Sequence, residues 1–155
     1  EKYDLKKTER IRREEIHGIE AHREYMREYH KIRSMNDIDF RLRNTLRARV
    51  REAIKNQGGN KSHQTKELIG CEVSFLREYL EAQFLEGMSW ENYGVWEIDH
   101  KKPCAAFDLS EINQQKECFH YTNLQPLWAK ENRSKSSSYK GKKYSVNINN
   151  KNYGE

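Results

Sequence analysis

Four polar side chains in the second half of the chain have the types that metal-assisted phosphodiester hydrolysis uses. Asp99 and His100 are adjacent, Asn123 follows 23 residues after the histidine, and Asn132 lies nine residues further on. A carboxylate and an amide carbonyl are hard oxygen ligands, which suit Mg²⁺ or Mn²⁺ better than Zn²⁺. A neutral imidazole can take a proton from water while the cation neutralises charge on the phosphate and on the leaving oxygen.

Two short strands and a helix must position these side chains. VWEIDH (95–100) predicts a strand that ends at Lys101-Lys102-Pro103, and TNLQPLW (122–128) predicts a second strand. Pro126 confines that second strand to an edge or to its own end, because proline lacks a backbone N–H. AKENRSKSS (129–137) predicts a short basic helix.

On these elements Asp99 and His100 stand at the end of the first strand, Asn123 at the start of the second, and Asn132 in the helix. Neighbouring residues on a strand point to opposite faces. We therefore expect an irregular strand end if Asp99 and His100 are to serve one site.

The stretch IDHKKP…HYTNLQPLWAKENRSK resembles the HNH endonuclease motif, the ββα-metal module of homing endonucleases, colicin-type DNases and RNA-guided nucleases. The resemblance covers residues 88–138. The preceding LRARVREAIK…KELIGCEVSFLREYLEAQF is similar to the helical lead-in of phage and large-virus members. The resemblance implies an α+β fold: a ββα-metal (HNH, His-Me finger) nuclease domain preceded by an extended basic helical region.

The resemblance also implies a role for each residue. Asp99 is similar to the metal-binding acid, His100 to the general base, Asn123 to the residue that ties the loop and orients the base, and Asn132 to the last metal ligand. Asn132 departs from the histidine of the family name, as in the His-Asn-Asn variant, which makes zinc or nickel less suitable. The chain also lacks the paired CxxC motifs of many relatives, so no structural zinc is expected.

The implied activity is a metal-dependent DNA endonuclease, nicking or homing-type, with one Mg²⁺ or Mn²⁺ per site and with 5′-phosphate and 3′-hydroxyl products. A non-catalytic nucleic-acid-binding module on the same scaffold remains an alternative, and so does an RNA-processing nuclease. His120 is the nearest competitor for a place at the site. Cys104 and Cys118 lack a third and a fourth ligand, so they are expected to pack in the core.

Charge distribution points to a polyanionic partner, namely DNA. Asp and Glu outnumber Lys and Arg in residues 71–128, whereas basic residues are in excess on both sides. A helix over 38–56 has one apolar ridge and many arginines, which could grip phosphates or merely solubilise the chain. The predicted DNA contacts are Arg41, Arg43, Arg47, Arg49, Arg51, Lys101, Lys102, Arg133 and Lys135.

The sequence divides into four predicted parts. They are a solvated helical arm (1–36), an arginine-rich helix and linker (37–70), the nuclease domain with its lead-in helix (71–138) and a loose basic tail (139–155). The arm has a thin apolar stripe that fits a partner or DNA, and coiled-coil pairing through it would give a homodimer.

Composition limits the remaining possibilities. The 155 residues are 35% hydrophobic and 34% charged, and the mean hydropathy is −1.16. Such a chain cannot bury a large core along its whole length, and no apolar run is long enough to cross a membrane. Three cysteines without CxxC spacing favour a reducing, intracellular location. The chain opens on Glu1, as expected of a piece of a longer protein.

Overall fold

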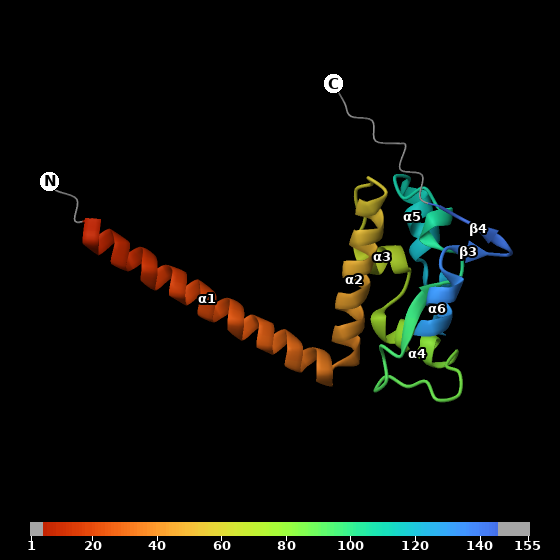
Figure 1. Ribbon diagram of the computed structural model, residues 1–155, viewed down its shortest axis with the longest axis horizontal. Helices are drawn as coiled ribbons and strands as arrows, with labels where there is room; N and C mark the ends of the chain where they lie inside the picture. The colour runs from red at the N-terminus through yellow and green to blue at the C-terminus, as the bar shows by residue number, and fades with distance from the viewer. Residues whose placement is uncertain (1–4, 146–155) are drawn as a thin grey trace, which may run out of the picture. The chain divides into compact units, whose positions relative to one another are not determined.

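The computed structural model describes residues 5–145, with side chains described from Glu14 onward. Helices dominate the described residues, and two small antiparallel sheets accompany them (Figure 1). This mixture agrees with the α+β class expected from the sequence. The chain divides into two compact units, Glu1–Arg41 and Leu42–Glu155. No helix among residues 5–145 is long and apolar enough to span a membrane.

The first unit is built on α1 (Leu5–Asn36), a single helix whose apolar side chains from Glu14 onward are largely exposed. Ile16 is 46% exposed and Ile19 is 50% exposed. The helix ends where Asp37 begins the next one, because the Asp37 carboxylate accepts a hydrogen bond from the Phe40 backbone N–H at 2.8 Å.

The helix that follows, α2 (Ile38–Asn56), has the bounds predicted from its apolar ridge. The buried members of this ridge are Leu42, Leu46, Val50 and Ile54. Two glycines end the helix for different reasons. Gly58 has φ +75°, and a Cβ on Gly59 would lie 2.5 Å from the Leu109 carbonyl oxygen. The first glycine therefore allows a left-handed turn, and the second allows close packing.

Two short helices extend the core of the second unit. They are α3 (Thr65–Ile69), which buries Leu68 and Ile69, and α4 (Val73–Glu81), which buries Leu76 and Leu80. A continuous apolar cluster joins α2 and α3 to the segment before the second strand, and it consists of Val50, Ile54, Leu68, Phe107, Leu109, Cys118 and Phe119.

The two predicted strands form one antiparallel sheet, β1 (Trp96–His100) with β2 (Leu124–Trp128), and α6 (Ala129–Lys135) follows directly. The connection contains the turn η1 (Cys104–Ala106), α5 (Ile112–Phe119) and the turn η2 (Tyr121–Asn123). Asn123 thus lies in a turn just before β2, and not in the strand itself. Both strands of a two-stranded sheet are edges, as Pro126 requires.

The basic tail, expected to be loose from Tyr139, begins instead as a hairpin of β3 (Ser138–Tyr139) and β4 (Lys142–Lys143). Lys140 and Gly141 both have positive φ, which is the conformation that a tight two-residue hairpin turn needs. Residues 146–155 of the predicted tail lie outside the described residues.

Candidate active site

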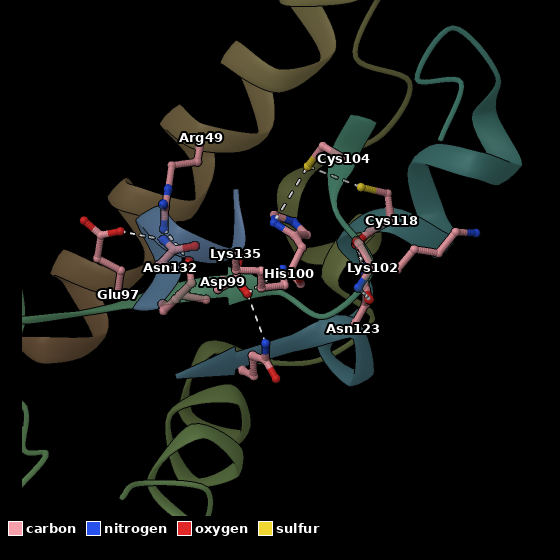
Figure 2. A network of polar contacts seen from close by, with 12 residues as sticks. Arg49, Glu97, Asp99, His100, Lys102, Cys104, Cys118, Asn123, Asn132 and Lys135 are labelled. Carbon is pink, nitrogen blue, oxygen red and sulfur yellow. Dashed lines mark hydrogen bonds and ion pairs between the residues drawn. The ribbon is translucent and has the colours of Figure 1, made fainter. Parts of the chain in front are cut away.

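Asn123 fastens the loop that leaves β1. Its side-chain oxygen accepts a hydrogen bond from the Lys102 backbone N–H at 2.9 Å, and its Nδ2 donates to the carbonyl oxygens of Lys102 and Cys118 at 3.0 and 2.8 Å (Figure 2). One amide side chain therefore joins the turn after β1 to the end of α5. The sequence resemblance assigned this loop-tying role to Asn123.

Asp99 is a buried carboxylate, 9% exposed, and it has two partners, one on β2 and one on α6. Gln125, its cross-strand neighbour on β2, donates from Nε2 to Asp99 Oδ2 at 3.0 Å. The Lys135 ammonium of α6 lies 2.8 Å from the same oxygen. A buried carboxylate needs such partners, because an isolated buried charge is very costly. The structure therefore places a positive charge directly on the predicted metal-binding acid.

Asn132 does not contact Asp99 directly. It donates from Nδ2 to Glu97 Oε2 at 2.7 Å, and this bond does not use the carbonyl Oδ1 that was predicted as a ligand atom. Glu97 did not emerge from the sequence interpretation, although it lies two residues before Asp99. That spacing puts both carboxylates on one face of β1. This face, covered by α6, thus gathers Glu97, Asp99, Asn132 and Lys135.

His100 leaves the strand on the opposite face from Asp99. Its ring lies edge-on to Phe119, with centroids 5.8 Å apart, and its Nδ1 is 3.7 Å from Cys104 Sγ. The expectation of an irregular strand end is wrong up to this residue, because β1 stays in register with β2 through the pair His100 and Leu124. The two halves of the site are linked at the strand end by Lys135, whose ammonium also donates to the His100 carbonyl oxygen at 2.6 Å.

Cys104 and Cys118 do more than pack in the core. The Cys118 thiol donates to Cys104 Sγ at 3.5 Å, and His100 completes a group of three ligand atoms that all lie within 4.8 Å of one another. A third atom of ligand type therefore lies beside the two cysteines, because the chain folds His100 onto them. In Figure 2 this cluster lies on one side of His100, and the Glu97–Asn132 pair lies on the other.

The cysteine pair shares its proton unequally. Hydrogen bonding from Cys118, and then from His100, lowers the pKa of Cys104 to about 5. The same sulfur contact and burial raise the pKa of Cys118 above its ordinary value. Cys104 is consequently the more readily ionised of the two thiols, and its Sγ lies where it can accept a hydrogen bond from His100 Nδ1 in the tautomer that carries the proton there.

The lysines and the arginine next to the site make contacts within the protein. Lys101 Nζ donates to the Tyr79 hydroxyl at 3.1 Å and to the Thr122 carbonyl at 2.9 Å. Lys102 pairs with Glu117 at 3.3 Å, and Arg133 Nε donates to the Ala129 carbonyl at 3.1 Å. Lys135 is turned toward Asp99. These four predicted DNA contacts have structural partners as well.

The arginines of α2 occupy more than one face of the helix. Arg43 and Arg47 line a groove of about 510 Å³ together with Lys61 and Lys66. Arg49, by contrast, donates from Nη1 to the Ile98 carbonyl oxygen at 2.7 Å. Arg51 is exposed. Arg41 belongs to the first unit, and its side chain is partly exposed there.

His120, the competing histidine, bonds within its own turn. Its Nδ1 lies 2.8 Å from Thr122 Oγ1. The ring packs against Gly70, where an added Cβ would lie 2.6 Å from His120 Cδ2. Gly70 also has φ +77°, so both its backbone conformation and its close contact with the ring favour glycine at this position. His120 accordingly contributes to the packing of the α3 end.

Comparison with known proteins identifies two similar chains, both from Acanthamoeba polyphaga mimivirus. Uncharacterized protein L246 is 42% identical over 101 residues, which is 64% of this chain and 43% of that protein. Uncharacterized protein L426 is 40% identical over 103 residues, which is 66% of this chain and 44% of that protein. The chain thus spans less than half the length of these curated relatives. No protein-family model and no solved structure matches it.

Proposed function

We propose that this protein is a metal-dependent DNA endonuclease of the HNH, or ββα-metal, type. The supporting observation is the succession of β1, a long connection, β2 and α6, which gathers Glu97, Asp99 and Asn132 on one strand face. Asn123 also supports the proposal, because it lies at the end of the sheet where His100 pairs with Leu124 and fastens the loop directly after His100. The products would be a 5′-phosphate and a 3′-hydroxyl.

The residues on the α6 face of β1 fit a hard divalent cation such as Mg²⁺ or Mn²⁺. Asp99 would supply a carboxylate oxygen and Asn132 its Oδ1, both of the hard class that these ions prefer. The Lys135 ammonium lies 2.8 Å from Asp99 Oδ2, so a bound cation would displace it from that oxygen. The cation would supply charge stabilisation to the phosphate and to the leaving oxygen.

His100 would act as the general base. In the tautomer whose Nδ1–H donates to Cys104 Sγ, the lone pair of the neutral ring would lie on Nε2. No hydrogen bond to Nε2 is found among residues 14–145, so this atom can accept the proton of an attacking water. Phe119 fixes the plane of the ring from its edge. Asn123 acts as a positioning residue, because its bonds hold the loop and not the substrate.

DNA would be held by the basic groove between α2 and α3. Arg43, Arg47, Lys61 and Lys66 lie along that groove and could contact backbone phosphates without reading the sequence. Such a partner implies an intracellular, nucleic-acid-associated location.

A plasmid-cleavage assay with the His100→Ala variant tests the proposal. In Mg²⁺ we expect the variant to lose about 10²- to 10⁴-fold in rate, the usual contribution of general acid–base catalysis. EDTA should abolish wild-type cleavage. The His22→Ala variant is the matched control, because His22 is exposed on α1 and should leave the rate unchanged. Full cleavage by the His100→Ala variant would overturn the assignment.

A non-catalytic nucleic-acid-binding module is the second candidate, and the Lys135–Asp99 ion pair favours it. A lysine that permanently neutralises Asp99 would leave no charge for a cation. Such a module would shift DNA equally in Mg²⁺ and in EDTA, and it would never cut. If cleavage is found, competition between DNA and RNA substrates separates a DNase from an RNA-processing enzyme.

A further inference from the structure

Three soft ligand atoms converge on the face of β1 that lies opposite Asp99. Cys104 Sγ is 3.7 Å from His100 Nδ1 and 3.5 Å from Cys118 Sγ. In a tetrahedral zinc site with Zn–S bonds near 2.3 Å, neighbouring ligand atoms are about 3.8 Å apart. Both separations are close to that edge length, and all three ligand atoms lie within 4.8 Å of one another. A cation could therefore be bound here once the third pair, Cys118 Sγ and the His100 ring nitrogen, closes to the same edge length.

The chemistry of this cluster differs from that of the Asp99 and Asn132 pair. Two thiols and an imidazole favour Zn²⁺ or other thiophilic cations, whereas carboxylate and amide oxygens favour Mg²⁺. Both sulfurs would bind the ion as thiolates, so any thiol proton still held by Cys104 or Cys118 would pass to solvent, and the two thiolates would neutralise a divalent charge in this largely buried position. His100 and Cys104 are partly exposed, so an ion can enter and a water can take the fourth position.

We propose that Cys104, Cys118 and His100 Nδ1 form a binding site for a thiophilic divalent cation, and that this cation inhibits the nuclease. The inhibitory consequence rests on the proposed function, whereas the metal site does not. A cation on Nδ1 leaves the single ring proton on Nε2. The ring then has no lone pair with which to accept a proton from water, and the general base is switched off.

A disulfide between Cys104 and Cys118 is the competing use of the two sulfurs. It would shorten their separation to about 2.0 Å and would need an added oxidant. Such a bond makes no use of His100, whereas the cation site explains why all three atoms converge. The disulfide therefore serves as an outcome of the test.

The binding test uses the full chain, reduced, with Zn²⁺ and with Co²⁺ as a spectroscopic substitute. We expect one Zn²⁺ per cluster and a thiolate-to-cobalt charge-transfer absorption. The Cys104→Ser variant should bind Zn²⁺ about 100-fold more weakly or worse, since loss of even an outer-shell partner costs 10- to 100-fold. Cys118→Ala is a second variant, and circular dichroism verifies that each one folds. Cys71→Ala is the matched control, because Cys71 lies outside the cluster.

Three results would overturn the site. They are the absence of a cobalt–thiolate band, an unchanged zinc affinity in the Cys104→Ser variant, and a Cys104–Cys118 disulfide in protein kept under thiol reductant. The inhibition is tested by cleavage in Mg²⁺ with and without Zn²⁺, each variant being compared with its own zinc-free rate. We expect Zn²⁺ to slow the wild type at least 10-fold and to leave the ratio for Cys104→Ser near one.

The two proposals fail in distinguishable ways. Equal inhibition of the wild type and of Cys104→Ser would place the inhibitory zinc at Asp99. It would overturn the proposal that zinc inhibits by binding to the cysteine cluster. A protein that binds zinc through its thiolates and never cuts DNA would contradict the nuclease proposal and support the metal site. A protein that cuts DNA and shows no thiolate–metal band would contradict this inference alone.

Discussion

Glu97 is the residue whose contact most directly shapes the candidate metal site. Its carboxylate holds the amide of Asn132 at 2.7 Å, so the orientation of Oδ1 depends on Glu97. In the Glu97→Ala variant we expect cleavage to fall about 10- to 100-fold and the Mg²⁺ requirement to rise, as for other outer-shell partners of metal ligands. The Glu97→Gln variant should recover most of the rate, because its side-chain oxygen still accepts the hydrogen bond.

The measurement is the Mg²⁺ dependence of plasmid cleavage, and Glu131→Ala is the control. Glu131 is exposed on α6, next to Asn132 in sequence. Equal rates for Glu97→Ala and wild type would show that Asn132 needs no such support.

Lys135 competes with a cation for Asp99. The Lys135→Met variant would leave a buried carboxylate with Gln125 as its one remaining partner among the described residues, at a cost of about 3–5 kcal/mol in the free energy of unfolding. Mg²⁺ would offset this loss by binding the folded state. We therefore expect a lower melting temperature than wild type without Mg²⁺, and a larger upward shift when Mg²⁺ is added.

Thermal unfolding over a series of Mg²⁺ concentrations measures both effects. Lys130→Met, on an exposed position of the same helix, should behave as wild type. If the melting temperature of Lys135→Met does not change with Mg²⁺ concentration, the assignment of Asp99 as a ligand is contradicted.

The sequence could supply candidate residues but not their partners. Asn123 and Asp99 stand out by type and spacing, and the structure gives Asn123 three hydrogen bonds and Asp99 one hydrogen bond and one ion pair. The contact between Glu97 and Asn132 spans 35 positions of the chain, and that between His100 and Cys104 depends on where η1 turns. Such contacts arise from tertiary packing, which hydrophobic periodicity does not encode.

Elements were predictable where their causes are local. The bounds of α2 follow from an apolar ridge and two glycines, all within the segment itself. The start of β2 was set two residues too early, because residues 121–123 form a turn that Asn123 fixes by bonds to Lys102. That turn is therefore a product of long-range contacts, which a local pattern could not show.

The arginine face of α2 carries a prediction at this scale. Arg47 lines the basic groove, and Arg51 lies one turn further along the helix. If both grip phosphates, the double variant Arg47→Gln/Arg51→Gln should have a slope of log K against log salt shallower by about 1.8, because each lost phosphate contact reduces it by about 0.9. Binding should weaken similarly on unrelated sequences.

Fluorescence anisotropy at several salt concentrations measures that slope. The double variant Lys116→Gln/Lys130→Gln removes the same charge from exposed positions away from the groove, so it is the matched control. A slope that is unchanged in the α2 variant would mean that these arginines only solubilise the helix.

The whole molecule consists of two compact units, and in the first unit α1 exposes several large apolar side chains. Ile16, Ile19, Tyr25, Ile32 and Met35 are all large apolar side chains at least 46% exposed. An isolated helix gains little from such exposure, and helices of this kind are stabilised by packing against a partner. A second copy of the chain is one partner that α1 could pair with.

The double variant Ile16→Glu/Ile19→Glu tests this pairing and, with it, the manner of cutting. One ββα-metal centre should cut one strand per engagement, so a monomer nicks a plasmid while a symmetric dimer can cut both strands. If α1 pairs two chains, sedimentation should show a wild-type dimer and a variant monomer, because two added charges would face each other across the pair. Plasmid products should change in parallel from linear to nicked.

Val95→Glu is the control, since Val95 is 61% exposed on the second unit. A variant that still sediments as the wild type does would show that α1 does not pair two chains, and the number of strands cut would then depend on the second unit alone.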